Sequence, residues 1–146
     1  MTAQCCALVG GEEAEAPTYV AIPPLGRVAC ALGEGYDAAI LIDAVPMGRA
    51  PGTVCIIEPA PESLAAHPAD AHPLSPVAVL RLAREMGTLP ESLLIVGCEP
   101  ARLGSGACPD SMCMDLSPQV SAAVERAAVV VAELAEQLAC GSSIAA

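Results

Sequence analysis

Short apolar runs and amphipathic stretches follow one another along most of the chain. Four runs rich in β-branched and aliphatic residues predict β-strands, at 18–22, 38–43, 53–57 and 92–96. The runs at 38–43 and 92–96 contain almost no polar residues, which is typical of strands buried on both faces of a sheet. These two segments therefore predict the centre of a sheet covered by helices.

Three segments have the spacing of amphipathic helices, at 26–32, 76–86 and 118–138. Two of them begin with the pairs Ser75-Pro76 and Ser117-Pro118, in which serine caps the helix and proline occupies its first position. The predicted inner faces consist of Val79, Leu82, Ala83 and Met86 in one helix, and of Val120, Val124, Ala127, Val131, Leu134 and Leu138 in the other.

Alternating strands and helices predict an α/β fold with three layers: a mostly parallel, twisted sheet with helices on both faces. The link between 38–43 and 53–57 is too short for a helix, so it predicts a hairpin and one antiparallel strand. We expect one domain at 18–140, preceded by an irregular segment at 1–17 and followed by a frayed tail at 141–146.

Composition narrows the functional classes. The chain has 54% hydrophobic residues, no Phe or Trp, and a formal net charge of −11. An acidic protein with only two aromatic residues, both Tyr, is a poor partner for nucleic acid or for an anionic membrane. Apolar runs of the roughly 18 residues that span a bilayer are missing, so we expect no membrane association.

The eight cysteines form no CxxC pair, and several lie in apolar runs. Such cysteines behave as small hydrophobic residues in a reducing compartment, and since the first residues do not resemble a secretory signal, we expect none. We therefore expect reduced cysteines, mostly buried, in a cytoplasmic protein. Cys108 and Cys113 remain an alternative redox pair.

The candidate ligand-binding and catalytic residues lie near the ends of predicted strands. Ligand sites of open α/β sheets lie beyond the carboxyl ends of the strands. Asp43 ends one buried strand, Cys98 and Glu99 follow another, and a loop carries His72. Asp43 with His72 supplies an oxygen and an imidazole nitrogen, a ligand pair suited to nickel or zinc. The alternative is that Asp43 only caps a neighbouring backbone group.

Five segments together resemble the hydrogenase maturation protease family, whose members process the C-terminus of the nickel hydrogenase large subunit. Residues 41–54, LIDAVPMGRAPGTV, resemble its VDAxxxGxxPGTV motif, and residues 72–76, HPLSP, resemble its conserved histidine segment. The remaining three segments, in the family's order, are 80–90, 93–100 (LLIVGCEP) and 116–120 (LSPQV).

The resemblance implies an endopeptidase that removes the C-terminal extension of a nickel-loaded [NiFe]-hydrogenase large-subunit precursor. It implies that the nickel arrives with the precursor and that Asp43 and His72 bind it as catalytic and metal-ligating residues. Ligand bonds of about 2.0–2.2 Å then place their side chains roughly 5–7 Å apart before the metal binds. The partner is the precursor, and the resemblance does not indicate an oligomeric state.

The sequence departs from the family at its N-terminus. The family's GNxLxxDDGxG motif, which supplies another acidic ligand, is absent, so we expect the family's first strand and helix to be missing through truncation or divergence. Glu12 or Glu13 is the candidate substitute ligand. The alternatives are a catalytically impaired relative that binds precursor or nickel without cleavage, and a non-enzymatic α/β interaction domain.

Overall fold

The structure is a computed structural model that describes residues 4–10, 17–22, 25–60, 76–87, 89–102 and 116–140. Its elements in chain order are β1 (Gln4–Val9), β2 (Thr18–Ile22), α1 (Leu25–Leu32), β3 (Ala38–Ala44), β4 (Val54–Ile57), α3 (Pro76–Met86), β5 (Ser92–Cys98) and α4 (Pro118–Ala139). The four predicted strands and three predicted helices are all present.

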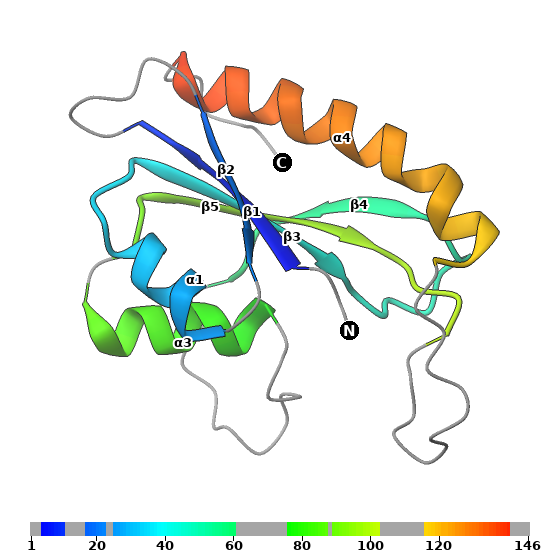
Figure 1. Cartoon of the computed structure of the whole chain (residues 1–146), viewed down its shortest axis with the longest axis horizontal. Coiled ribbons are helices and arrows are strands. Elements are labelled where there is room, and N and C mark those ends of the chain that lie inside the picture. The colour runs from blue at the N-terminus through cyan, green and yellow to red at the C-terminus, as the bar shows by residue number, and fades with distance from the viewer. Residues whose placement is uncertain are drawn as a thin grey trace.

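These strands form one mixed sheet in the order β2-β1-β3-β5-β4 (Figure 1). Strands β3 and β5 are parallel, whereas β1 is antiparallel to both of its neighbours and β4 is antiparallel to β5. It follows that β2, β3 and β5 run in one direction and that β1 and β4 oppose them. The α/β class is confirmed, but the sheet has a second antiparallel strand where we expected one.

The second antiparallel strand comes from the segment that we expected to be irregular. Residues 4–9 form β1 between β2 and β3, with Ala7 opposite both Tyr19 and Ile40. The side chains of residues 6–9 are buried, and they alternate between the two faces of the sheet. Burial on both faces therefore places these residues inside the sheet, so the expectation was wrong for this part of 1–17.

The predicted hairpin between β3 and β4 is also wrong. Strand β5 lies between them, pairing Ile42 with Val96 on one side and Val96 with Ile56 on the other. The segment after β3 crosses the end of β5 instead of turning back along β3, because its amides bond to the backbone there: the Val45 N–H donates to the Cys98 carbonyl at 3.0 Å. The antiparallel direction of β4 was predicted correctly, but not its neighbour.

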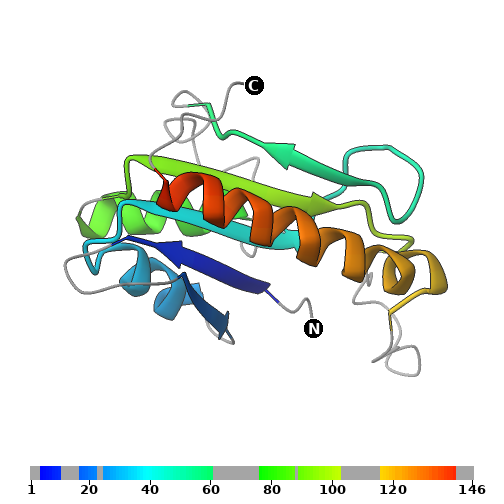
Figure 2. The same cartoon turned by 90° about the horizontal axis from the view of Figure 1, so that it is seen from above.

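Helices cover both faces, as predicted. Helices α1 and α3 lie together on one face and α4 spans the other (Figures 1 and 2). Each face has its own apolar cluster: Leu8, Leu41 and Leu80 belong to the α1–α3 side, and Ile40 and Val131 to the α4 side. Odd-numbered residues of β3 therefore face α1 and α3, and even-numbered ones face α4.

Most inner positions of the helices were predicted correctly. In α4, the Ser117 hydroxyl accepts the Val120 N–H at 3.4 Å, which is the expected cap. Met86 and Val124, however, are about half exposed, because each lies at the margin of its apolar stripe. We also expected mostly buried cysteines. Cys6 is buried as expected, whereas Cys30 and Cys140 are exposed.

The position of β1 can be tested with Leu8→Ala. Leu8 is 1% exposed in the α1–α3 cluster. Removing its buried side chain atoms should lower the free energy of unfolding by about 2–5 kcal/mol, measured by urea denaturation. The control Met86→Ala truncates an exposed side chain and should change it by less than about 0.5 kcal/mol. Equal small effects of both substitutions would contradict a central β1.

Candidate functional site

The candidate site lies at the carboxyl edge of the parallel pair β3 and β5. The register places Asp43 beside Gly97 and Ala44 beside Cys98, so both strands end in one row. This is the edge at which ligands bind in open α/β sheets. The residues singled out from the sequence, Asp43, Cys98 and Glu99, are brought together here.

Asp43 is a nearly buried carboxylate, 7% exposed. Its Oδ1 atom accepts the Ala44 N–H at 2.8 Å, so it does cap a neighbouring backbone group. Since odd positions of β3 face α1 and α3, the Asp43 side chain belongs to that face. A carboxylate has two oxygen atoms that can accept several bonds, so capping of Ala44 and metal ligation are chemically compatible roles.

Glu99 is the second nearly buried acid, 6% exposed. Its Oε2 atom accepts the Met47 N–H at 2.6 Å and the Arg49 N–H at 3.1 Å. Hydrogen bonds to an ionised group are among the stronger ones in proteins. Glu99 therefore fixes the loop that directly follows Asp43. Sequence reasoning placed Glu99 at this edge but missed this role, which depends on partners about fifty positions away in the chain.

Backbone hydrogen bonds hold the far end of the same loop. The Gly52 N–H donates to the Glu99 carbonyl at 2.8 Å, and the Glu99 N–H donates to the Thr53 carbonyl at 2.8 Å. Gly52 has φ +83°, and a Cβ atom there would lie 2.5 Å from the carbonyl oxygen of Gln119. A side chain at position 52 would therefore collide with the first turn of α4.

Cys98 does not have the character of a nucleophilic cysteine. Burial raises the pKa of the Cys98 thiol; the nearby Arg126 charge lowers it and the Glu99 charge raises it further. A raised pKa keeps the thiol protonated at neutral pH, and the thiolate is the reactive form. The site therefore favours carboxylate chemistry over cysteine chemistry.

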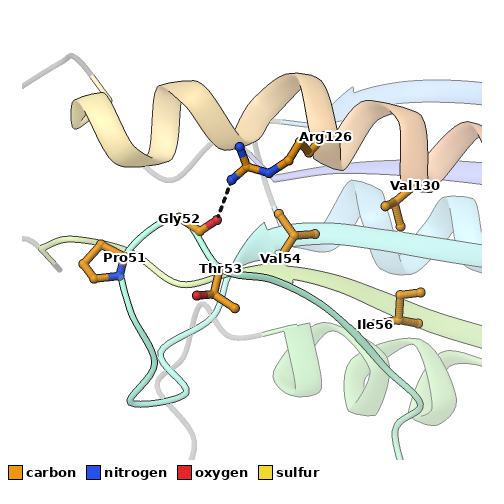
Figure 3. Close-up of a pocket in the computed structure, with 7 residues that line it drawn as sticks. All are labelled: Pro51, Gly52, Thr53, Val54, Ile56, Arg126 and Val130. Carbon is orange, nitrogen blue, oxygen red and sulfur yellow. Dashed lines mark hydrogen bonds between the residues drawn. The ribbon is translucent and has the colours of Figure 1, made fainter.

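A groove opens on the opposite face, between β4 and α4 (Figure 3). Its volume is about 550 Å³, and it is lined by Pro51, Gly52, Thr53, Val54, Ile56, Arg126 and Val130. Arg126 reaches from α4 and donates to the Gly52 carbonyl at 3.2 Å. The loop between β3 and β4 therefore borders both the groove and the Asp43 edge, which lie on opposite sides of the sheet.

Comparison with known proteins identifies the family. The model of the family described as "Hydrogenase maturation protease" matches residues 28–134, which include Asp43, Glu99 and the loop between β3 and β4. The chain belongs to the hydrogenase maturation protease family. The resemblance seen in five sequence segments is thereby confirmed.

A solved structure of the hydrogenase maturating endopeptidase HybD from E. coli agrees with this assignment. It is 28% identical in sequence with a TM-score of 0.54, and the match covers 77% of this chain and 66% of HybD. The chain thus matches slightly less than two thirds of the length of HybD. Comparison with curated proteins yields no match.

Other residues that the family resemblance nominates lie outside the described part of the chain. These are His72, Glu12 and Glu13. The alternative pair Cys108 and Cys113 lies outside it as well. Within the described ranges, no three His, Cys, Asp or Glu residues are grouped so as to hold a metal ion, and no helix is long and apolar enough to cross a membrane. Ligation of nickel by Asp43 and His72 therefore stays a prediction.

The role of Glu99 in this protease-family loop can be tested with Glu99→Ala. The substitution leaves the Met47 and Arg49 amides without their carboxylate, so it should lower the free energy of unfolding by about 2–4 kcal/mol. Hydrogen exchange of these two amides should also accelerate relative to amides in β3. The control Glu125→Ala removes an exposed acid from α4. Unchanged exchange of both amides would contradict the role assigned to Glu99.

Proposed function

We propose that this chain is an endopeptidase that removes the C-terminal extension of a nickel-loaded [NiFe]-hydrogenase large-subunit precursor. The observation that carries the proposal is the nearly buried Asp43 carboxylate at the carboxyl edge of the sheet, inside the part of the chain that matches the family. A carboxylate in this place is well suited to a cation that arrives with the substrate. The nickel is thus part of the substrate and is not resident in the protease.

The proposed chemistry assigns Asp43 and His72 as ligands of that nickel. A carboxylate oxygen and an imidazole nitrogen match the preferences of a divalent transition metal. By binding this nickel, the protease would recognise the loaded precursor, and the nickel could polarise the scissile carbonyl or a bound water. Glu12 or Glu13 is the proposed substitute for the acidic ligand of the absent N-terminal motif. We place the reaction in the cytoplasm, where free thiols such as those of Cys6 and Cys98 persist.

Two alternatives make different demands on the same residues. A relative that binds precursor or nickel without cleavage needs Asp43 for affinity but forms no shortened product. A non-enzymatic interaction domain needs Asp43 only for structural contacts such as the cap of Ala44. Product formation, precursor affinity and stability therefore separate the three functions.

Asp43→Asn tests the proposal most cleanly, because the amide oxygen can still accept the Ala44 N–H while the negative charge is lost. We expect nickel-dependent trimming of the precursor to disappear while the protein still folds. His72→Ala should abolish trimming as well. The measurement is a gel assay of precursor shortening with and without nickel.

The control for this assay is Glu133→Gln, which neutralises an exposed acid on α4. It should trim like the parent protein, so that loss of one negative charge alone is not the cause. Unchanged trimming by Asp43→Asn would refute the ligand assignment. Precursor binding without trimming by the parent protein would instead support the impaired relative.

A further inference from the structure

Strand β4 has an outer edge that no described strand pairs. The Glu99 N–H donates to the Thr53 carbonyl, and residues 53 and 99 continue the register in which Val54 lies opposite Cys98. In an antiparallel pair, the backbone groups of every second residue bond to the neighbouring strand, so those of Cys55 and Ile57 bond to β5. The N–H and C=O groups of Val54 and Ile56 therefore point away from the sheet.

Within β4 itself, this edge lacks the usual protection against strand addition. Natural edge strands carry charged side chains, proline or bulges that block pairing with another chain. The sequence of β4 is Val-Cys-Ile-Ile, without a charge or proline. Ile56 is 50% exposed, although most large aliphatic side chains in the described part of the chain are covered. An apolar edge of this kind is suited to an extended peptide.

The groove beside the edge adds side chain recognition. Val54 and Ile56 of β4 and Val130 of α4 give it apolar walls (Figure 3). An added strand presents alternate side chains to one face, so its apolar residues would enter this groove. The geometry thus provides both backbone partners and a pocket for every second side chain.

Arg126 supplies the charge that the groove offers to a ligand. Its guanidinium donates to the carbonyls of Ala122 and Gly52, at 3.0 and 3.2 Å. Both acceptors are neutral, so the positive charge remains available to a carboxylate. Arg126 is the charged residue in the groove lining of a chain whose formal net charge is −11. This charge favours a ligand with a carboxylate beside Arg126. Repulsion between two copies of net charge −11 disfavours a second copy of the chain as the occupant.

We infer that β4 and this groove dock an extended, apolar segment of the precursor, which adds a strand to the sheet and places a carboxylate against Arg126. The inference rests on the proposed function and deepens it by naming a substrate-binding surface. Cys55, Gly97 and Asp43 lie in one row, so the edge strand is about 10 Å from the Asp43 backbone, two strand spacings away. A segment that leaves the edge beyond Gly52 arrives at the same end of the sheet as Asp43.

Ile56→Pro tests the docking because proline removes an outward N–H and leaves the bonds of Cys55 and Ile57 to β5 in place. The probe is the C-terminal segment of the precursor, synthesised with fluorescein and measured by fluorescence anisotropy. The docked peptide would lose its hydrogen bond to the Ile56 N–H, and the adjacent hydrogen bonds to β4 would weaken. The Kd of the peptide should therefore rise about tenfold. The KM for trimming should rise by a similar factor while kcat is unchanged.

A second pair of measurements isolates the charge. Arg126→Gln should weaken binding of the peptide about tenfold. A peptide whose carboxylates are amidated should bind Arg126→Gln and the parent protein equally. Val124→Thr, at an exposed apolar position on α4 outside the groove lining, is the matched control and should leave Kd and KM unchanged. If Ile56→Pro does not fold, Ile56→Lys places a charge on the same edge and should raise Kd and KM in the same way.

The outcomes separate this inference from the proposed function. Trimming with unchanged Kd and KM in the Ile56 and Arg126 variants would overturn the docking surface and leave the protease intact. Peptide binding that depends on Ile56 and Arg126, with no trimming by the parent protein, would support the docking surface and refute the protease. A dimer in sedimentation that Ile56→Pro dissociates, with Kd unchanged, would overturn the inference by assigning the edge to a second copy.

Discussion

The Glu99 carboxylate is the interaction on which the candidate site depends. It is nearly buried, and it accepts the backbone N–H groups of Met47 and Arg49 from the loop that follows β3. A buried charge is stable only when it is hydrogen-bonded, and a loop that crosses a strand end needs partners for its backbone. The loop amides stabilise the buried Glu99 carboxylate, and the carboxylate gives these amides a hydrogen-bond partner. The loop is therefore fixed over the end of β5, directly after Asp43.

This constraint also explains the arrangement around the site. With the loop bound across β5, strand β4 pairs on the far side of β5 and becomes the edge of the sheet. The same crossing brings Gly52 against the start of α4 and within reach of Arg126. One loop thus has Asp43 at its beginning and the β4–α4 groove at its end. The two surfaces lie on opposite faces of the sheet but are ordered by the same hydrogen bonds.

Much of the fold follows from sequence pattern because its signals are local. Buried strands such as β3 and the serine cap of α4 depend on residues near in the chain, and they were predicted correctly. The position of β1 and the insertion of β5 beside β4 depend on pairings between distant segments, which a single sequence does not encode locally. At the site, strand ends identified Asp43 and Glu99, but the partners of Glu99 required the tertiary structure.

We propose above that the Asp43 carboxylate and the His72 imidazole together bind nickel. A crystal structure of the protein soaked with nickel, with anomalous scattering recorded at the nickel edge, tests it directly. We expect one anomalous peak about 2.0–2.2 Å from an Asp43 carboxylate oxygen and from a His72 imidazole nitrogen. A peak at other residues, or Asp43 and His72 side chains on opposite faces of the sheet, would contradict it.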